Sequence, residues 1–133
     1  MNEYRSTAEY MHQLRLPGAR GIPDNLWTSF CKVIQELKPH IEELHISQAS
    51  LSTVQLTQLF EALSAEDLKT IEIFSANLED DILDSLCKLI SKSLQLEQLK
   101  LSDNKLTHKG LEQISYQIRM AICQGSRIKT LHL

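Results

Sequence analysis

The chain has 133 residues, and its 14 basic and 17 acidic side chains give a formal net charge of −3. This length fits one domain, and scattered basic residues in a mildly acidic chain argue against nucleic acid as a partner. The polar start MNEYRSTAEY has no secretory hydrophobic region, and no apolar run approaches the ~18 residues that a membrane span needs. We therefore expect a cytoplasmic protein without a membrane partner.

A six-residue frame, L-x-x-L-x-L, recurs along the chain and is followed by a polar turn and another aliphatic residue. Its copies begin near residues 11, 41, 68, 96 and 128 and read MHQLRL, IEELHISQASL, LKTIEIFSANL, LEQLKLSDNKL and IKTLHL. Alternating aliphatic residues within each copy are typical of a strand with one buried face. With 22 Leu and 12 Ile against only two Val, the composition favours a helix-rich or repetitive fold over a β-sandwich.

Between the frames the apolar spacing changes from 2 to 3.6, which predicts one helix after each strand. Helix starts are indicated by Asp24 after Pro23, by Ser52 with Gln55 as a capping box, and by Thr107. The first helix should end at Lys38-Pro39 and the last at Gly125. Apolar stripes fill the later helices: Leu56, Leu59, Phe60 and Leu63; Leu83, Leu86, Cys87 and Ile90; and Leu111, Ile114, Ile118, Ala121 and Ile122.

These repeats resemble the leucine-rich repeat family, in its long-repeat, ribonuclease-inhibitor-like variety. The resemblance implies an α/β solenoid with about five parallel strands on its concave side and helices on its convex side. The family frame also has Asn or Cys three residues after the third aliphatic, which here only Asn104 provides. Because Ala19, Ala49 and Ala76 occupy the matching positions, we expect irregular turns in the first three repeats.

The ends of the single domain, residues 1–133, are expected to differ from its interior. Residues 1–10, with Tyr4 and Tyr10, should cap the first repeat, and Trp27 beside an inward-facing Leu26 should pack at the same end. At the other end, Leu131 and Leu133 have no following repeat to cover them. This predicts a monomer or weak self-association, with the final strand either open or shielded by the preceding helix.

Strand residues between the aliphatics should face outward onto the concave surface. One such position reads Arg15, His45, Glu72, Lys100 and His132 on successive strands. The row is either a solvated polar face or a charge ladder in which Glu72 pairs with His45 and Lys100. Phe74 is a large apolar residue on this polar surface, so it is a candidate hot spot unless it is a common isolated exposed ring. The candidate partner-binding residues are Arg15, Glu43, His45, Glu72, Phe74, Lys100, Ser102, Asp103 and His132.

No pattern of catalytic or cofactor-binding residues is present in the sequence. Cys31, Cys87 and Cys123 are odd in number and lack paired spacing, which predicts core thiols and neither a disulfide framework nor a zinc site. The five His show no metal-ligand spacing. The acidic run Glu79, Asp80, Asp81 and Asp84 falls at a predicted helix start, where carboxylates complement the helix dipole. We therefore expect no enzyme, no metal and no cofactor.

The function expected from the repeats is non-catalytic recognition of another protein through the concave sheet. The family resemblance implies that such binding can inhibit an enzyme by occluding its active site. The Ile-, Gln-, Lys- and Ser-rich composition is also similar to that of small bacterial leucine-rich repeat effectors, which would place the chain in a host cytoplasm. The alternative is a structural or assembly subunit, or a fragment of a longer repeat protein, that associates through its open ends.

Overall fold

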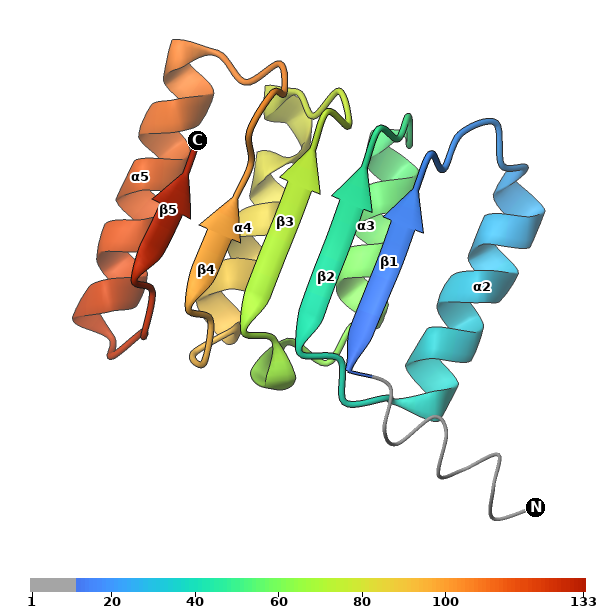
Figure 1. The fold of residues 1–133 in the computed structure, drawn as a ribbon, viewed down its shortest axis with the longest axis horizontal. Coiled ribbons are helices and arrows are strands. Elements are labelled where there is room, and N and C mark those ends of the chain that lie inside the picture. The colour runs from blue at the N-terminus through green and yellow to red at the C-terminus, as the bar shows by residue number, and fades with distance from the viewer. Residues whose placement is uncertain (1–11) are drawn as a thin grey trace.

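Strands and helices alternate along the chain in the computed structural model, which describes residues 12–133 (Figure 1). The expected repeat start at Met11 and the expected cap of residues 1–10 lie outside the described residues. The strands are β1 Gln13–Pro17, β2 Glu43–Ser47, β3 Thr70–Phe74, β4 Gln98–Lys100 and β5 Thr130–His132. The helices are α2 Asp24–Leu37, α3 Thr53–Ala62, α4 Leu83–Lys92 and α5 His108–Cys123, with 3₁₀ turns η1 Ala65–Asp67 and η2 Asp80–Ile82.

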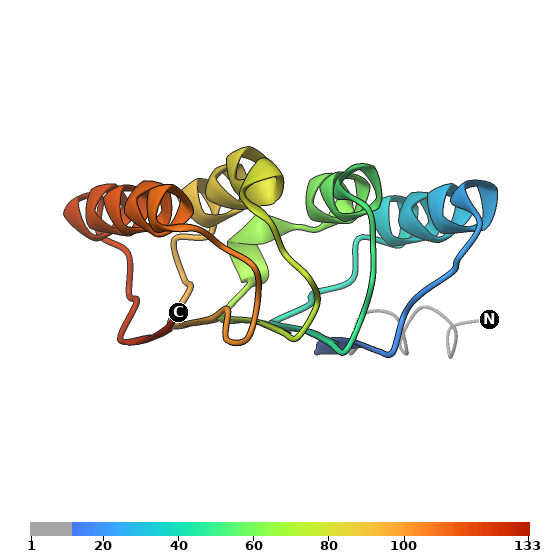
Figure 2. The same ribbon diagram turned by 90° about the horizontal axis from the view of Figure 1, so that it is seen from above.

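The five strands form one parallel sheet in the order β1-β2-β3-β4-β5. Each strand therefore pairs with the strand that follows it in the chain, and each connection passes through a helix. All the labelled helices lie on one side of the sheet (Figure 2). The other side, called the open face below, carries the alternate strand residues. The predicted α/β class and the five parallel strands are confirmed.

The same backbone geometry recurs where each strand after the first begins. The carbonyl oxygen of His12 accepts from the backbone N–H groups of both Glu42 and Glu43, at 2.8 and 3.0 Å. Matching pairs of bonds end on the carbonyl oxygens of Glu42, Lys69 and Glu97. Because four successive junctions share this pattern, the repeat inferred from the sequence is also a repeat of backbone hydrogen bonding.

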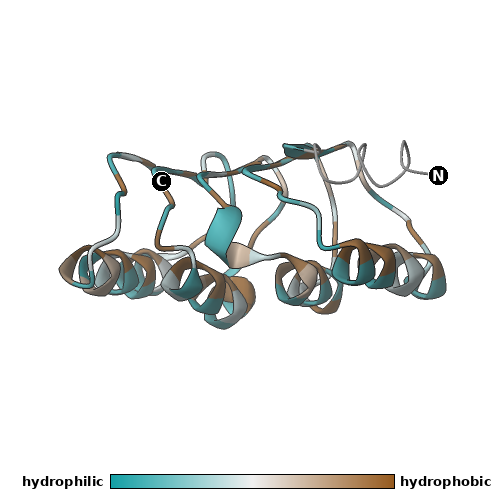
Figure 3. Cartoon of the chain, turned by 90° about the horizontal axis from the view of Figure 1, so that it is seen from below, coloured by the Kyte–Doolittle hydropathy of each residue, from teal (hydrophilic) through white to brown (hydrophobic). Residues whose placement is uncertain are grey.

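The core lies between the sheet and the helices. Leu44, Ile71 and Leu99 are paired in register on neighbouring strands, and each is fully buried. Hydrophobic and hydrophilic residues are mixed along every helix (Figure 3), as expected for amphipathic helices that pack with one side on a sheet. Leu86 and Ile114 supply that side in α4 and α5 and are fully buried. A layer of strands on a layer of helices thus shares one continuous core.

The turns after the strands share one left-handed position, but the first and third turns each add a second left-handed residue, Gly21 and Asn77, so the expectation of irregular turns in the first three repeats is confirmed in part. Gly18, Gln48, Ser75 and Asp103 occupy matching positions, and all have φ between 50° and 66°. Backbone bonds join neighbouring repeats at the same point of each turn: the N–H of Gly18 donates to Ser47, that of Gln48 to Phe74, and that of Ser75 to Ser102. The main chain can therefore hold this turn without a polar side chain.

Asn104 adds a side-chain hydrogen-bond network at its own turn, as the family frame predicts. Its Oδ1 accepts from the backbone N–H groups of Ala76 and Leu78, at 3.0 and 3.2 Å. Its Nδ2 lies within hydrogen-bonding distance of the carbonyl oxygens of Ile73, Leu101 and Ser102. This one side chain joins the turns of the third and fourth repeats.

Helix boundaries confirm most of the predicted signals. Ser52 forms the predicted capping box with Gln55, and Thr107 accepts from the N–H of Gly110 at the start of α5. Lys38 ends α2 in the left-handed conformation. Asp24, however, is not a cap, because the N-cap is Pro23 and Asp24 is already the first helical residue.

In the first turn of α2 the buried residue is Trp27, and the residue predicted to face inward, Leu26, is exposed. Trp27 is buried, and its Nε1 donates to the carbonyl oxygen of Gln55 at 2.8 Å, which confirms its structural role. Leu26, expected to face inward, is 59% exposed. It begins an exposed apolar stripe on α2 that continues through Val33 and Leu37. Adjacent residues point in directions about 100° apart on a helix, so only one of Leu26 and Trp27 can face the core.

Candidate functional site

The open face carries a row of five polar residues at the same position of successive strands. Arg15 pairs with His45, His45 with Glu72, Glu72 with Lys100, and Lys100 with His132. This is the predicted row, so the predicted register is confirmed. His45, Glu72 and Lys100 each stand between two buried aliphatic residues of their strand, which fixes the direction of the polar side chain. At the edges the cover is weaker: Leu16 is half-buried, and Leu131 and Leu133 are exposed.

His45 lies between two carboxylates at the centre of this row. Its Nε2 is 2.9 Å from Oε1 of Glu43 on its own strand, and its Nδ1 is 3.2 Å from Oε2 of Glu72 on β3. The imidazole is only 16% exposed. An imidazolium donates from both ring nitrogens, so this arrangement is complementary to the protonated ring. The half of the predicted charge ladder that joins His45 to Glu72 is therefore present.

Two further side chains extend the network toward β1. Gln13 donates from Nε2 to Oε2 of Glu43 at 3.1 Å, and Arg15 donates from Nε to Oε1 of Gln13 at 2.9 Å. The hydrogen bond from His45 is the main cause that lowers the pKa of Glu43, and the bond from Gln13 and the positive charge of Arg15 add to it. Sequence reasoning did not select Gln13, although its position two residues before Arg15 puts both on one strand face.

The other carboxylates near the start of the strands also have cationic partners. Lys69 lies 3.8 Å from Glu42, and Lys129 lies 2.9 Å from Glu97. The hydrogen bond and the charge of Lys129 lower the pKa of Glu97. Glu42 and Glu97 thus each have a Lys of the neighbouring strand segment as partner, whereas Glu43 and Glu72 share the single imidazole of His45.

Lys100 departs from the predicted ladder. It lies opposite Glu72 in the register, but within residues 12–133 no ion pair of 4.0 Å or less joins it to a carboxylate. The predicted bond between Glu72 and Lys100 is therefore wrong, because the Glu72 carboxylate turns toward His45. Arg15, at the other end of the network, likewise makes no ion pair with a described carboxylate.

Phe74 is the last residue of β3, lies on the open face and is 40% exposed. It lies opposite Ser47 in the register, and the N–H of Ser75 donates to the carbonyl oxygen of Ser102 at 3.3 Å, which keeps the fourth repeat alongside. The hydroxyl of Ser75 donates to Asp103. An exposed aromatic ring thus stands between short serine side chains, as the sequence predicts.

The last candidate, His132, lies on the edge strand β5. It is exposed, and its carbonyl oxygen accepts from the N–H of Leu101 at 2.7 Å. Leu131 and Leu133 are each 42% exposed, so α5 leaves these aliphatic residues partly uncovered. Of the two expected arrangements of this edge, the open one is observed.

The acidic run after β3 has a structural use that differs in detail from the prediction. Asp80 accepts from both the backbone N–H and the hydroxyl of Thr107, and these bonds lower its pKa. Asp81 accepts from the hydroxyl of Thr53 at 2.7 Å, and Asp84 accepts from Nε2 of Gln113 at 3.0 Å. The carboxylates join neighbouring repeats, and only Asp84 lies in the first turn of α4.

The cysteines differ in burial, so the expectation of three core thiols is wrong for one of them. Cys31 is buried, Cys87 is half-buried, and Cys123 is exposed. Burial raises the pKa of both Cys31 and Cys87, and the charge of Asp84 raises that of Cys87 further. Ile122, expected on the apolar stripe of α5, is likewise exposed, because the stripe ends at Ala121.

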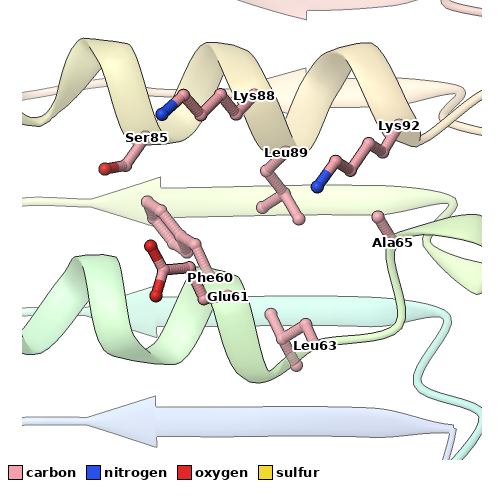
Figure 4. A pocket seen from close by; sticks show the side chains of 8 residues that line it. All are labelled: Phe60, Glu61, Leu63, Ala65, Ser85, Lys88, Leu89 and Lys92. Carbon is pink, nitrogen blue, oxygen red and sulfur yellow. The ribbon is translucent and has the colours of Figure 1, made fainter.

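A groove lies on the helical side, between α3 and α4 (Figure 4). Its volume is about 360 Å³, and Phe60, Leu63 and Leu89 form its apolar part beneath Lys88 and Lys92. Further grooves lie along the helices, and one lies among the loops that precede α3 and α4.

Among residues 12–133, no group of three or more His, Cys, Asp or Glu side chains is arranged to hold a metal ion. In the same part of the chain, none of the helices has the length and apolar character needed to cross a bilayer.

No protein-family model matches the sequence, and no curated protein is significantly similar to it. The arrangement of the open face is therefore the basis for a functional proposal.

Proposed function

We propose that this chain is a leucine-rich repeat solenoid that recognises another protein through the open face of its sheet, without catalysis. Three features support the fold: the consecutive strand order, the helices on one side only, and the Asn104 network at the position where the repeat frame has Asn. Strand and helix units that stack in one direction bury a shared core and leave an extended face for binding.

The observation that carries the functional proposal is Phe74. Its ring is exposed at the end of the central strand, on a face whose other outward strand residues, apart from Pro17 two strands away, are polar or charged. Aromatic residues concentrate binding energy at protein interfaces, and charged neighbours fix the orientation of the partner. A partner held here would cover a broad surface, so an enzyme bound by its active-site rim would be inhibited by occlusion.

The proposal is tested by capture from a cytosolic lysate followed by titration of the purified captured protein. Three chains are compared: the wild type, Phe74→Ala, and Tyr116→Ala as a matched control. Tyr116 is an aromatic residue on α5 with 64% exposure, so it lies on the helical side. Removing an anchoring ring costs ~2 kcal/mol or more, or roughly a thirtyfold loss of affinity, which we expect for Phe74→Ala only. Equal affinities of the three chains would refute the proposal.

The second candidate function is assembly through the ends, with a second copy of the chain as the occupant. Apolar residues are exposed at both ends: Leu26, Val33 and Leu37 on α2, and Leu131 and Leu133 on β5. An end-to-end contact between copies would pair β5 with a new strand and would cover both apolar surfaces. Sedimentation over a wide concentration range tests it: growth in mass that Leu131→Lys abolishes supports assembly, and an ideal monomer contradicts it.

A further inference from the structure

His45 can donate to both of its neighbouring carboxylates only while each of its ring nitrogens carries a proton. Its Nε2 lies 2.9 Å from Glu43, and its Nδ1 lies 3.2 Å from Glu72. A neutral imidazole has a single N–H donor, and the lone pair on its other nitrogen repels a carboxylate oxygen. Imidazole is also the side chain whose charge ordinarily changes between pH 5 and 8. One of the two contacts is therefore lost when the ring loses its proton.

The charged groups that face the imidazole differ in how firmly they are held. They are Arg15 on β1, Glu43 on β2 and Glu72 on β3. Glu43 also accepts a hydrogen bond from Nε2 of Gln13 at 3.1 Å, and the positive charge of Arg15 attracts it. Glu72 is 39% exposed, its contact with His45 is the longer one, and it has no second ion pair within residues 12–133. Glu72 is therefore the carboxylate that a neutral ring releases.

A cation is available on the other side of Glu72. Lys100 is its register partner on β4, just as His45 is its register partner on β2. Both neighbours lie one strand spacing away, ~4.8 Å, so a flexible carboxylate can reach either of them. Within the described residues, Lys100 makes no ion pair of 4.0 Å or less. A Glu72 side chain that leaves His45 thus has an unpaired ammonium group to turn to.

We propose that Glu72 is a proton-controlled switch, which pairs with His45 while the imidazole is protonated and turns to Lys100 when the imidazole is neutral. The observed arrangement is the one complementary to the protonated ring, and the bond to Lys100 that is absent from it belongs to the neutral state. Phe74 lies two residues beyond Glu72 on the same face, so the switch changes the charges beside that ring. The switch is a property of the free chain and does not depend on the proposed function, but it would make binding through the open face depend on pH.

Side-chain NMR of the whole chain between pH 5 and 8 tests the switch, at low salt so that ion pairs are little screened. The ring nitrogens of His45 report its protonation, and the methylene group next to the Lys100 ammonium group reports its pairing. We expect the Lys100 signal to shift in step with the loss of the His45 proton, and the neutral ring to keep its proton on Nε2. Lys129 is the matched control, because its partner Glu97, 2.9 Å away, has no described histidine within ion-pair distance. Its signal should not follow His45.

Two variants separate the switch from a general effect of pH. Glu72→Gln removes the moving carboxylate, so the pH-dependent shift of the Lys100 signal should vanish. His45→Gln removes the titrating ring, so Lys100 should show in mild acid the signal that it shows in the wild type at pH 8. A wild-type Lys100 signal that does not follow His45, or a shift that survives in Glu72→Gln, would overturn the proposal. So would a neutral ring protonated on Nδ1, because it would keep Glu72. Melting curves verify that each variant is folded.

Discussion

The two faces of the sheet are built from alternating residues of the same five strands, yet they differ in what holds each side chain. On the inner face Leu44, Ile71 and Leu99 are fully buried, and their positions are determined by packing. On the open face, Lys100 is half-buried and makes no ion pair with the described residues. Packing on the inner face therefore defines the fold, and the open face is the one that we propose for recognition.

The largest loss of stability is expected from a charge placed on the inner face. Leu99→Asp would bury a carboxylate where no cation can reach it, and the free energy of unfolding should fall by several kcal/mol, on the order of 4. Urea denaturation followed by circular dichroism measures the loss. Lys100→Asp, one residue further along the strand, is the matched control and should change stability by less than about 1 kcal/mol. Equal losses would show that the two faces are assigned wrongly.

Asn104 is the polar side chain on which a turn depends most. Asn104→Ala should cost about 1–3 kcal/mol, because the backbone groups it binds at Ala76, Leu78 and Ile73 lose their partner. Alanine already occupies the matching position at Ala49 and Ala76, so the backbone accepts it without steric conflict. Thermal melting measures the change, with the exposed neighbour variant Lys105→Ala as the reference. No loss beyond that of Lys105→Ala would mean that the main chain alone holds this turn too.

Acid affects the two faces differently, because it protonates carboxylates on the open face, whereas the inner face carries apolar side chains. The pKa of Glu43 is lowered in the folded chain, so its contribution to stability is present at neutral pH and is lost as pH falls through that lowered pKa. The melting temperature of Glu43→Gln should therefore lie slightly below that of the wild type at neutral pH and approach it in acid. The solvent-exposed position keeps the effect small. A difference that grows on acidification would contradict this assignment.

The rate at which a thiol reagent modifies each cysteine measures how buried that cysteine is, and the modification of an exposed cysteine should hardly change the fold. A brief treatment with maleimide should modify Cys123 first, because it is exposed, whereas burial raises the pKa of Cys31 and Cys87 and restricts access to them. Mass spectrometry of peptides identifies the modified residue. The variant Cys123→Ser should lose the rapid phase. Rapid modification of Cys31 in the folded chain would show that the contact between α2 and α3 opens readily.

The sequence predicts the inner face better than the open one. Aliphatic spacing located all five strands and the row from Arg15 to His132, because burial imposes a strict period of two. It could not predict that Glu72 turns toward His45 and away from Lys100, since both neighbours lie at one strand spacing. It also misassigned Leu26, where two adjacent apolar residues compete for one inward position, and it did not predict the left-handed residue that the turns share, which backbone bonds between repeats accompany.

If the open face binds a partner independently of the core, as we propose, Phe74→Ala should reduce binding and leave the fold stable. The measurement pairs two quantities on the same preparation: the melting temperature of the variant and its affinity for the purified captured protein. We expect an almost unchanged melting temperature and roughly a thirtyfold loss of affinity. A lowered melting temperature would place the ring in the core, and an unchanged affinity in a folded variant would place the binding site elsewhere on the molecule.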